Sequence, residues 1–112
     1  MPNNKIIQIV AAESSTPEKD AKFAKWYTEK HVPMLFGYEG VKQASRYKLK
    51  GDDKNCSKYL TFYEFETEDA LKEFPKSKAF AAAIEDFEAM KDELGFNMRW
   101  AGVYELIKSW KR

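Results

Sequence analysis

The sequence is poor in the residues from which many reactive sites are built. Its 112 residues include one cysteine, Cys56, and one histidine, His31. One thiol cannot form an intramolecular disulfide or a zinc site, so a reducing, cytoplasmic setting is expected. The lone histidine and the scattered carboxylates lack the spacing of a metal site. We therefore expect no metal, and we interpret Cys56, in the polar stretch GDDKNCSK, as a residue of a surface loop.

Long apolar runs and an excess of one charge are also missing. No run approaches the roughly 18 apolar residues of a membrane span, and MPNNKIIQIVAAESS lacks the features of a signal peptide. Lys and Arg number 19 against 18 Asp and Glu, with both signs interspersed. Such a balance argues against binding of a nucleic-acid backbone, and no glycine-rich phosphate loop is present. Neither a membrane nor a nucleic acid is an expected partner.

The length suits one compact core, so we treat residues 1–112 as a single domain. Short runs rich in β-branched and aromatic residues predict four strands, at residues 5–12, 41–49, 59–65 and 97–110. The polar connection between the second and third strands indicates an antiparallel hairpin.

Two helical regions separate these strands. Thr16 and Pro17 are typical of a helix start, and Pro33 disfavours helical backbone at the residue before it, so the first helix should end near His31. A short helix capped by Thr67 follows the third strand and is interrupted by Pro75. A longer helix from about Ser77 to Gly95 then carries one apolar stripe.

The resulting order, β-α-β-β-α-β, predicts an α+β ferredoxin-like fold with two helices on one face of a four-stranded antiparallel sheet. In a sheet with one solvent-exposed face, the strands should alternate apolar and polar residues. However, residues 6–10 and 59–65 are largely apolar or aromatic on both faces. Because something must cover the second face, we expect a homodimer.

These features resemble the dimeric α/β-barrel superfamily, and in particular its EthD-like branch. The likeness rests on the helix end WYTEKHVP, the turn GYEG, the strand VKQASRYKL, the strand YLTFYEF and the helix opening SKAFAAAIEDF. It implies paired sheets that form a barrel and hold a small aromatic or polyketide-like ligand. Activities in that superfamily are diverse, so the fold does not define the reaction.

His31 is the strongest candidate for catalysis. A histidine changes charge near neutral pH, and a helix C-terminus favours its charged form, so His31 could act as an acid or base. The resemblance implies that this helix end borders the cavity. The alternative is that the imidazole only binds the last carbonyls of its own helix.

Other polar and aromatic side chains are candidates for binding a ligand. Tyr59, Thr61 and Tyr63 share one face of a strand and would either orient a phenolic or keto ligand or pack locally. Trp100 and Tyr104 share a face of the last strand, where Trp100 fits a pocket wall and the core equally well. Trp26 fits the core better.

We consider two roles for Arg46. Its planar guanidinium could bind a carboxylate or enolate, or it could pair with Glu64 or Glu105 on neighbouring strands, which we favour.

The leading hypothesis is a homodimeric, cofactor-independent enzyme of the oxygenase, cyclase or isomerase type that acts on a small aromatic or keto-type compound. His31 would be the acid or base, Arg46 and Tyr63 would orient the ligand or stabilise an oxyanion, and Trp100 would form the apolar wall. The alternative is a non-catalytic ligand-binding or structural dimer. A haem-degrading oxygenase is disfavoured because haem-handling relatives usually place a histidine on the second helix, and SKAFAAAIEDFEAM has none.

Overall fold

Four antiparallel strands form one sheet in the computed structural model, which describes residues 5–112. The strands are β1 (Ile6–Ser14), β2 (Val41–Lys48), β3 (Tyr59–Phe65) and β4 (Phe96–Glu105). Their order across the sheet is β2-β3-β1-β4, so β2 and β4 are its edges. This is the expected ferredoxin-like α+β arrangement, and the four strands lie close to the residues predicted for them.

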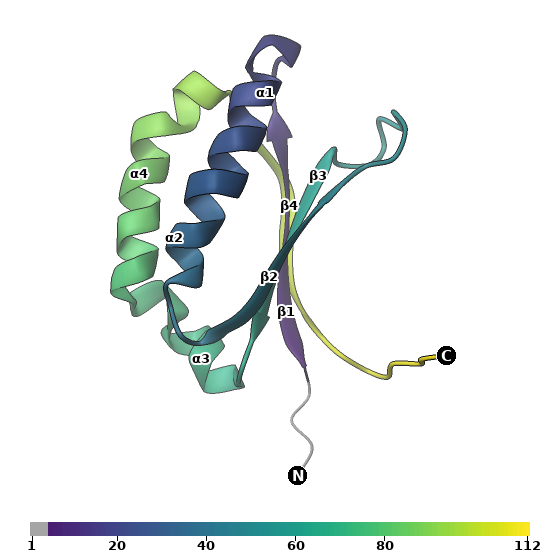
Figure 1. Ribbon diagram of the computed structural model, residues 1–112, viewed down its shortest axis with the longest axis vertical. Coiled ribbons are helices and arrows are strands. Elements are labelled where there is room, and N and C mark those ends of the chain that lie inside the picture. Colours follow the sequence, from purple (N-terminus) through teal and green to yellow (C-terminus); the bar gives the residue numbers. More distant parts are fainter. Residues whose placement is uncertain (1–4) are drawn as a thin grey trace.

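All helices cover one face of the sheet (Figure 1). The first helical segment consists of α1 (Pro17–Trp26), the π-helical turn η1 (Tyr27–His31) and α2 (Val32–Phe36). The second consists of α3 (Glu68–Glu73), the 3-10 turn η2 (Phe74–Lys76) and α4 (Lys78–Leu94). Ser77 caps α4 by accepting a hydrogen bond from the Phe80 N–H, and Gly95, at φ 62°, ends it in left-handed backbone. No helix within residues 5–112 is long and apolar enough to cross a membrane.

The first helical segment continues past His31, so the predicted end near that residue is wrong. The Val32 N–H donates to the carbonyl of Tyr27, five residues earlier, which is the bond of a π turn. Pro33 has no N–H, and its ring crowds the carbonyl four residues before it. One wide turn ahead of Pro33 accommodates both effects, and the chain stays helical to Phe36. His31 therefore lies inside a helical segment and not at its end.

Two irregularities in strand pairing decide which side chains face the helices. Along β2, Val41 pairs with Phe65 and Gln43 with Glu64, so Lys42 is an extra residue. Along β4, Trp100 pairs with Ala11 and Met98 with Ala12, so Arg99 is an extra residue. Each bulge shifts the alternation of side chains by one position.

The helix-facing side of the sheet packs into two buried clusters. One gathers around Phe23, Tyr27 and Leu94, and the other around Tyr63, Phe65 and Phe74. Between the clusters, the sheet and the helices leave space at the middle of the layer.

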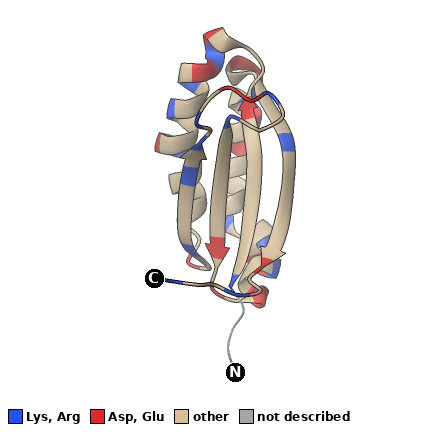
Figure 2. Ribbon diagram, turned by 90° about the vertical axis from the view of Figure 1, so that its right-hand side faces the viewer, with Lys and Arg blue, Asp and Glu red and all other residues tan. Residues whose placement is uncertain are grey.

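Among residues 5–112, no helix covers the opposite face of the sheet (Figure 1), and the strands consist mainly of uncharged residues (Figure 2). Pairing places Ile7, Ile9, Leu60 and Phe62 on it, together with three exposed aromatic residues. These are Tyr47, Trp100 and Tyr104, with 58%, 43% and 49% of their surface exposed. We call this surface the open face. It matches the expectation of an apolar second face.

Candidate functional site

A cavity of about 210 Å³ lies between the sheet and the helices. It is lined by Gln8, Val10, Tyr27, His31, Leu35, Tyr63, Phe74, Phe80, Ile84, Phe87, Phe96 and Met98. Ile84 on α4 and Met98 on β4 are 39% and 50% exposed, so they mark the side of the cavity that faces solvent. The interior is largely aromatic, with a few polar groups. Ligand sites in proteins commonly have this composition.

His31 reaches this cavity from the π turn. Only 8% of its surface is exposed, and its ring stacks on Trp26 at 4.7 Å between centroids. Tyr27 packs edge-on against it at 4.9 Å. Nδ1 of His31 is buried and has no hydrogen-bond partner among the described residues. His31 therefore does not cap the carbonyls of its own helix through Nδ1.

The pKa of His31 falls from 6.5 to about 4, mainly because of burial, and the nearby charge of Arg46 contributes to the decrease. The carboxylate of Asp86 acts in the opposite direction but does not offset the burial. The expectation that a helix end would raise the pKa is therefore wrong, because His31 is buried within a longer helical segment. At neutral pH its imidazole is uncharged.

Asp86 on α4 supports the His31 ring from outside the cavity. Its Oδ2 accepts a 2.8 Å hydrogen bond from Trp26 Nε1, and its Oδ1 pairs with Lys30 Nζ at 2.9 Å. Partial burial would raise the pKa of Asp86, but the bonds from Lys30 and Trp26 bring it below its ordinary value. The ionised carboxylate thus holds the indole on which the His31 ring stacks.

Tyr63 brings a second unpartnered polar atom to the cavity. Its side chain is 2% exposed, and within residues 5–112 its Oη has no partner at full hydrogen-bond geometry, although it interacts with the neighbouring phenol of Tyr27. Burial raises the pKa of Tyr63 well above 10, and the neighbouring phenol of Tyr27 adds to this effect. The pKa of Tyr27 is also raised by burial. Both phenols therefore remain protonated at neutral pH and can donate hydrogen bonds.

Arg46 lies on the helix-facing side of β2, beside the cavity wall but not in it. Its Nη1 donates to Thr61 Oγ1 at 3.1 Å and its Nε to Thr28 Oγ1 at 3.3 Å. The guanidinium carbon lies 4.2 Å from the Tyr27 ring centroid and 5.0 Å from that of Tyr59. Burial lowers the pKa of Arg46, and cation–π contacts offset part of the loss of water.

The favoured pairing of Arg46 with Glu64 or Glu105 is wrong. Glu64 points to the open face, where it pairs with Lys5 and Lys42. Glu105 lies on β4, at the other edge of the sheet from β2.

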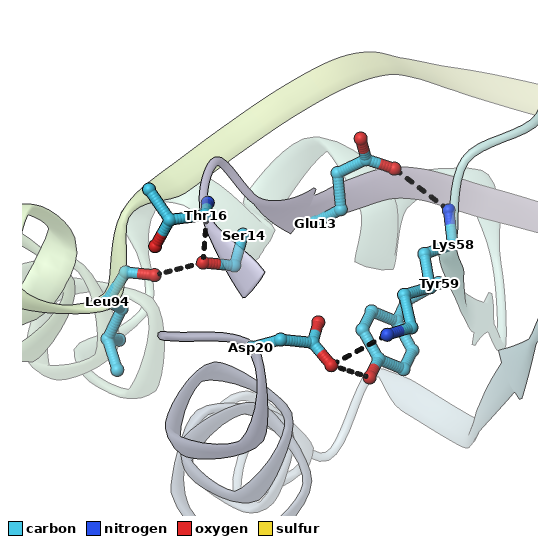
Figure 3. Close-up of polar contacts among 7 residues, drawn as sticks. All are labelled: Glu13, Ser14, Thr16, Asp20, Lys58, Tyr59 and Leu94. Atoms are coloured by element: carbon cyan, nitrogen blue, oxygen red, sulfur yellow. Dashed lines mark hydrogen bonds and ion pairs between the residues drawn. The ribbon is translucent and has the colours of Figure 1, made fainter. Parts of the chain in front are cut away.

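A polar cluster anchors Tyr59 near the start of α1 (Figure 3). Asp20 Oδ2 accepts hydrogen bonds from Tyr59 Oη at 3.1 Å and from Lys58 Nζ at 2.7 Å. The Lys58 N–H also donates to Glu13 Oε1 at 2.9 Å. These contacts tie α1 to β1 and β3. Tyr59 does not line the cavity, and its ring instead supports the Arg46 guanidinium.

Apart from Trp26, on which the His31 ring stacks, the remaining candidates lie away from His31. Trp100 and Tyr104 are on the open face, with the whole sheet between them and the cavity. Thr61 is 1% exposed and binds Arg46. Trp26 is 7% exposed, and Cys56 is exposed. Within residues 5–112, no three His, Cys, Asp or Glu side chains form a group that could hold a metal ion.

The structure adds two polar residues that the sequence analysis did not propose, Tyr27 and Gln8. Tyr27 precedes His31 by four residues, a spacing that places both side chains on one face of a helix. The sequence alone could therefore have placed Tyr27 beside His31. Gln8 interrupts an otherwise apolar strand. Because Gln8 lies on the face toward the helices, its position in the strand also indicates a polar group in the cavity wall.

Several solved structures share this fold. HapK from Hahella chejuensis superposes with a TM-score of 0.69 at 11% identity, covering 96% of this chain and 97% of its own. An EthD family protein from Bacillus halodurans gives 0.61 at 13% identity, covering 88% and 96%. SnoaB from Streptomyces nogalater, a cofactor-independent oxygenase, gives 0.60 at 12% identity, covering 97% of both chains. At such identities these likenesses show the fold alone, and they confirm the dimeric α/β-barrel, EthD-like resemblance at that level.

Among curated proteins, none matches this sequence significantly. A family model does match, over residues 14–97, and its description is a domain of unknown function, DUF4286. The matched range includes α1, the π turn with His31, β2, β3 and α4, and therefore most of the cavity wall. The chain belongs to the DUF4286 family.

Proposed function

We propose that this protein is a cofactor-independent enzyme that binds a small aromatic or keto-type compound in the cavity and transfers a proton there. One observation carries the proposal: in the part of the chain that the structure describes, Nδ1 of His31 and Oη of Tyr63 are buried without a partner at hydrogen-bond geometry, and both side chains line one apolar cavity. Burying an unsatisfied polar group costs about 1–3 kcal/mol. Such a cost at two neighbouring positions supports a role in ligand binding.

His31 and Tyr63 would have different roles in the reaction. The neutral imidazole accepts a proton at Nδ1 from an acidic O–H or C–H group of the ligand. The protonated phenol of Tyr63 donates a hydrogen bond to the ligand oxygen on which negative charge develops. Asp86 favours the imidazolium that forms, because its carboxylate raises the pKa of His31. Arg46 contributes a positive field from behind Tyr27.

Ligand-dependent hydrogen exchange tests the proposal. A thermal-shift screen of phenols and cyclic ketones identifies a ligand, and exchange of its acidic protons with deuterium is followed by NMR. We expect His31→Phe, which keeps a ring against Trp26, to slow exchange at least about 100-fold. Binding without any exchange, or exchange unchanged in His31→Phe, would favour a non-catalytic ligand-binding protein.

Replacing Tyr63 should change the stability of the protein and its ligand affinity in opposite directions. In Tyr63→Phe the buried hydroxyl without a partner disappears, so we expect the free protein to gain about 1 kcal/mol of unfolding free energy. Ligand binding should weaken at the same time, because the hydrogen-bond donor is lost. Urea denaturation and ligand titration measure the two effects.

Tyr38→Phe is the matched control for that variant. It removes a hydroxyl that donates to the Ala70 carbonyl at 2.8 Å and lies outside the cavity wall, so we expect stability to fall by about 1 kcal/mol and ligand binding to stay unchanged. A Tyr63→Phe protein that is less stable than the wild type would show that the hydroxyl is already satisfied in the fold.

We also propose that two copies associate through their open faces. Tyr47, Trp100 and Tyr104 lie there with about half of their surface exposed, beside Leu60 and Phe62. Contiguous apolar surface of this kind is typical of an interface, and a twofold axis would pair the patch with itself. The His31 cavity lies on the other side of the sheet, so each subunit would hold its own site. The family resemblance instead implies a ligand inside the barrel.

Sedimentation velocity at micromolar concentration tests the dimer. We expect the wild type to sediment as a dimer and Trp100→Glu to dissociate at least about tenfold more readily, because a charge would be buried against apolar surface. Phe36→Glu is the control, since Phe36 is equally exposed but lies on α2. A monomeric wild type would refute the dimer and leave the cavity proposal untouched.

A further inference from the structure

The walls of the His31 cavity carry no charge. None of the side chains that line it within the described residues is a lysine, arginine, aspartate or glutamate. Its one group that ionises near neutral pH is His31, which burial keeps uncharged there. Its other polar groups are the phenols of Tyr27 and Tyr63 and the amide of Gln8.

The nearest cation is not available to a ligand. Arg46 is absent from the cavity wall, and its guanidinium lies over the ring of Tyr27, which does belong to the wall. Two of its nitrogens are already engaged by Thr61 and Thr28. Lys30 does not line the cavity and is paired with Asp86, which also binds Trp26. A carboxylate in the cavity would therefore lose its water without gaining a cation.

The volume restricts the ligand further. About 210 Å³ exceeds the roughly 150 Å³ that is known to accommodate benzene, but it leaves little beyond one substituted ring. Aromatic side chains form much of the cavity wall, and the unpartnered atoms of His31 and Tyr63 can form directional hydrogen bonds to a ligand.

We infer that the cavity selects uncharged single-ring compounds with a hydrogen-bonding oxygen or nitrogen, and that it excludes carboxylates and ammonium ions of the same shape. This inference deepens the proposed function by defining its ligand class. It reverses the idea that Arg46 fixes an anionic ligand. Selectivity here comes from the cost of moving an ion into a cavity with no opposite charge.

Two isosteric pairs of compounds test the inference at neutral pH. Benzamide and benzoate differ in charge but hardly in shape, as do benzyl alcohol and benzylammonium. Binding is followed by chemical-shift changes of the residues that line the cavity. We expect each neutral compound to bind at least about 100-fold more tightly than its charged counterpart. Equal or tighter binding of benzoate, or no shift at the cavity with any of the four, would overturn the inference.

A positive charge placed at the cavity mouth should weaken the preference for neutral compounds over carboxylates. Ile84 lines the cavity and is 39% exposed, so Ile84→Lys can keep its ammonium hydrated while reaching a ligand. We expect this variant to raise the ratio of benzoate to benzamide affinity at least about tenfold, and Ile84→Met to leave the ratio unchanged. No change in Ile84→Lys would count against exclusion by charge.

The outcomes separate this inference from the proposed function. If neutral compounds bind but none exchanges a proton, the enzyme proposal fails and the selectivity stands. If a carboxylate binds the wild type tightly and undergoes exchange, the selectivity fails and the enzyme proposal stands.

Discussion

Lowering the pH from 6.5 to 4 should cost this protein about 3 kcal/mol of unfolding free energy through His31 alone. The folded-state pKa of His31 is about 4, whereas the unfolded chain has the ordinary value of 6.5. Between these values the unfolded chain binds a proton that the folded protein does not, so stability falls as the pH falls. Above pH 6.5 both states hold a neutral imidazole, and the effect is absent.

Urea denaturation at a series of pH values measures this loss. His31→Phe is the control, because subtracting its pH profile removes the contribution of the carboxyl groups. The difference between the two proteins should change by about 3 kcal/mol across the window and stay flat outside it. NMR titration of the imidazole gives the pKa directly. A His31 that titrates near 6.5 in the folded protein would show that its ring is hydrated, and it would remove the electrostatic basis of the proposed site.

Truncating Phe23 should destabilise the protein by about 3–5 kcal/mol. Phe23 is 0% exposed and packs against Tyr27, Tyr59 and Phe96, with ring centroids 5.5, 5.9 and 6.0 Å away. Phe23→Ala would remove the ring around which helix α1 meets the sheet. Because Tyr27 also contacts His31, we expect the imidazole pKa to move toward its ordinary value as water enters.

Phe36→Ala is the matched control for Phe23→Ala. Phe36 is 50% exposed at the end of α2, so its truncation should cost less than about 1 kcal/mol. Urea midpoints with an unchanged m-value report both effects. A small loss in Phe23→Ala would mean that the aromatic cluster is loosely packed and that the geometry around Tyr27 does not depend on it.

Local sequence patterns were sufficient to predict most of the fold. The run YLTFYEF, rich in aromatic and β-branched residues, corresponds to β3, and the apolar stripe after Ser77, closed by Gly95, corresponds to α4. The excess of apolar residues on both faces of the strands anticipated the open face. These features can be predicted locally because side-chain periodicity and helix capping involve residues a few positions apart.

The end of the first helix could not be predicted in the same way. Pro33 usually marks a boundary, but here a π turn accommodates it, and packing of Leu35 into the core keeps the chain helical beyond it. Tertiary contacts thus overrode a local preference.

The composition and order of the elements were sufficient to predict the class of fold and the apolar second face, and they singled out His31 as the candidate for catalysis. The face occupied by Arg46 and the protonation of His31 required the folded molecule. A bulge at Lys42 turns Arg46 toward the helices, and a bulge depends on which residues of β3 pair with β2. The pKa of His31 is low because the folded protein excludes water from its ring, which packs near Phe87 of α4, more than fifty positions away along the chain. Burial and strand register are properties of contacts between distant segments, and local sequence patterns do not encode them.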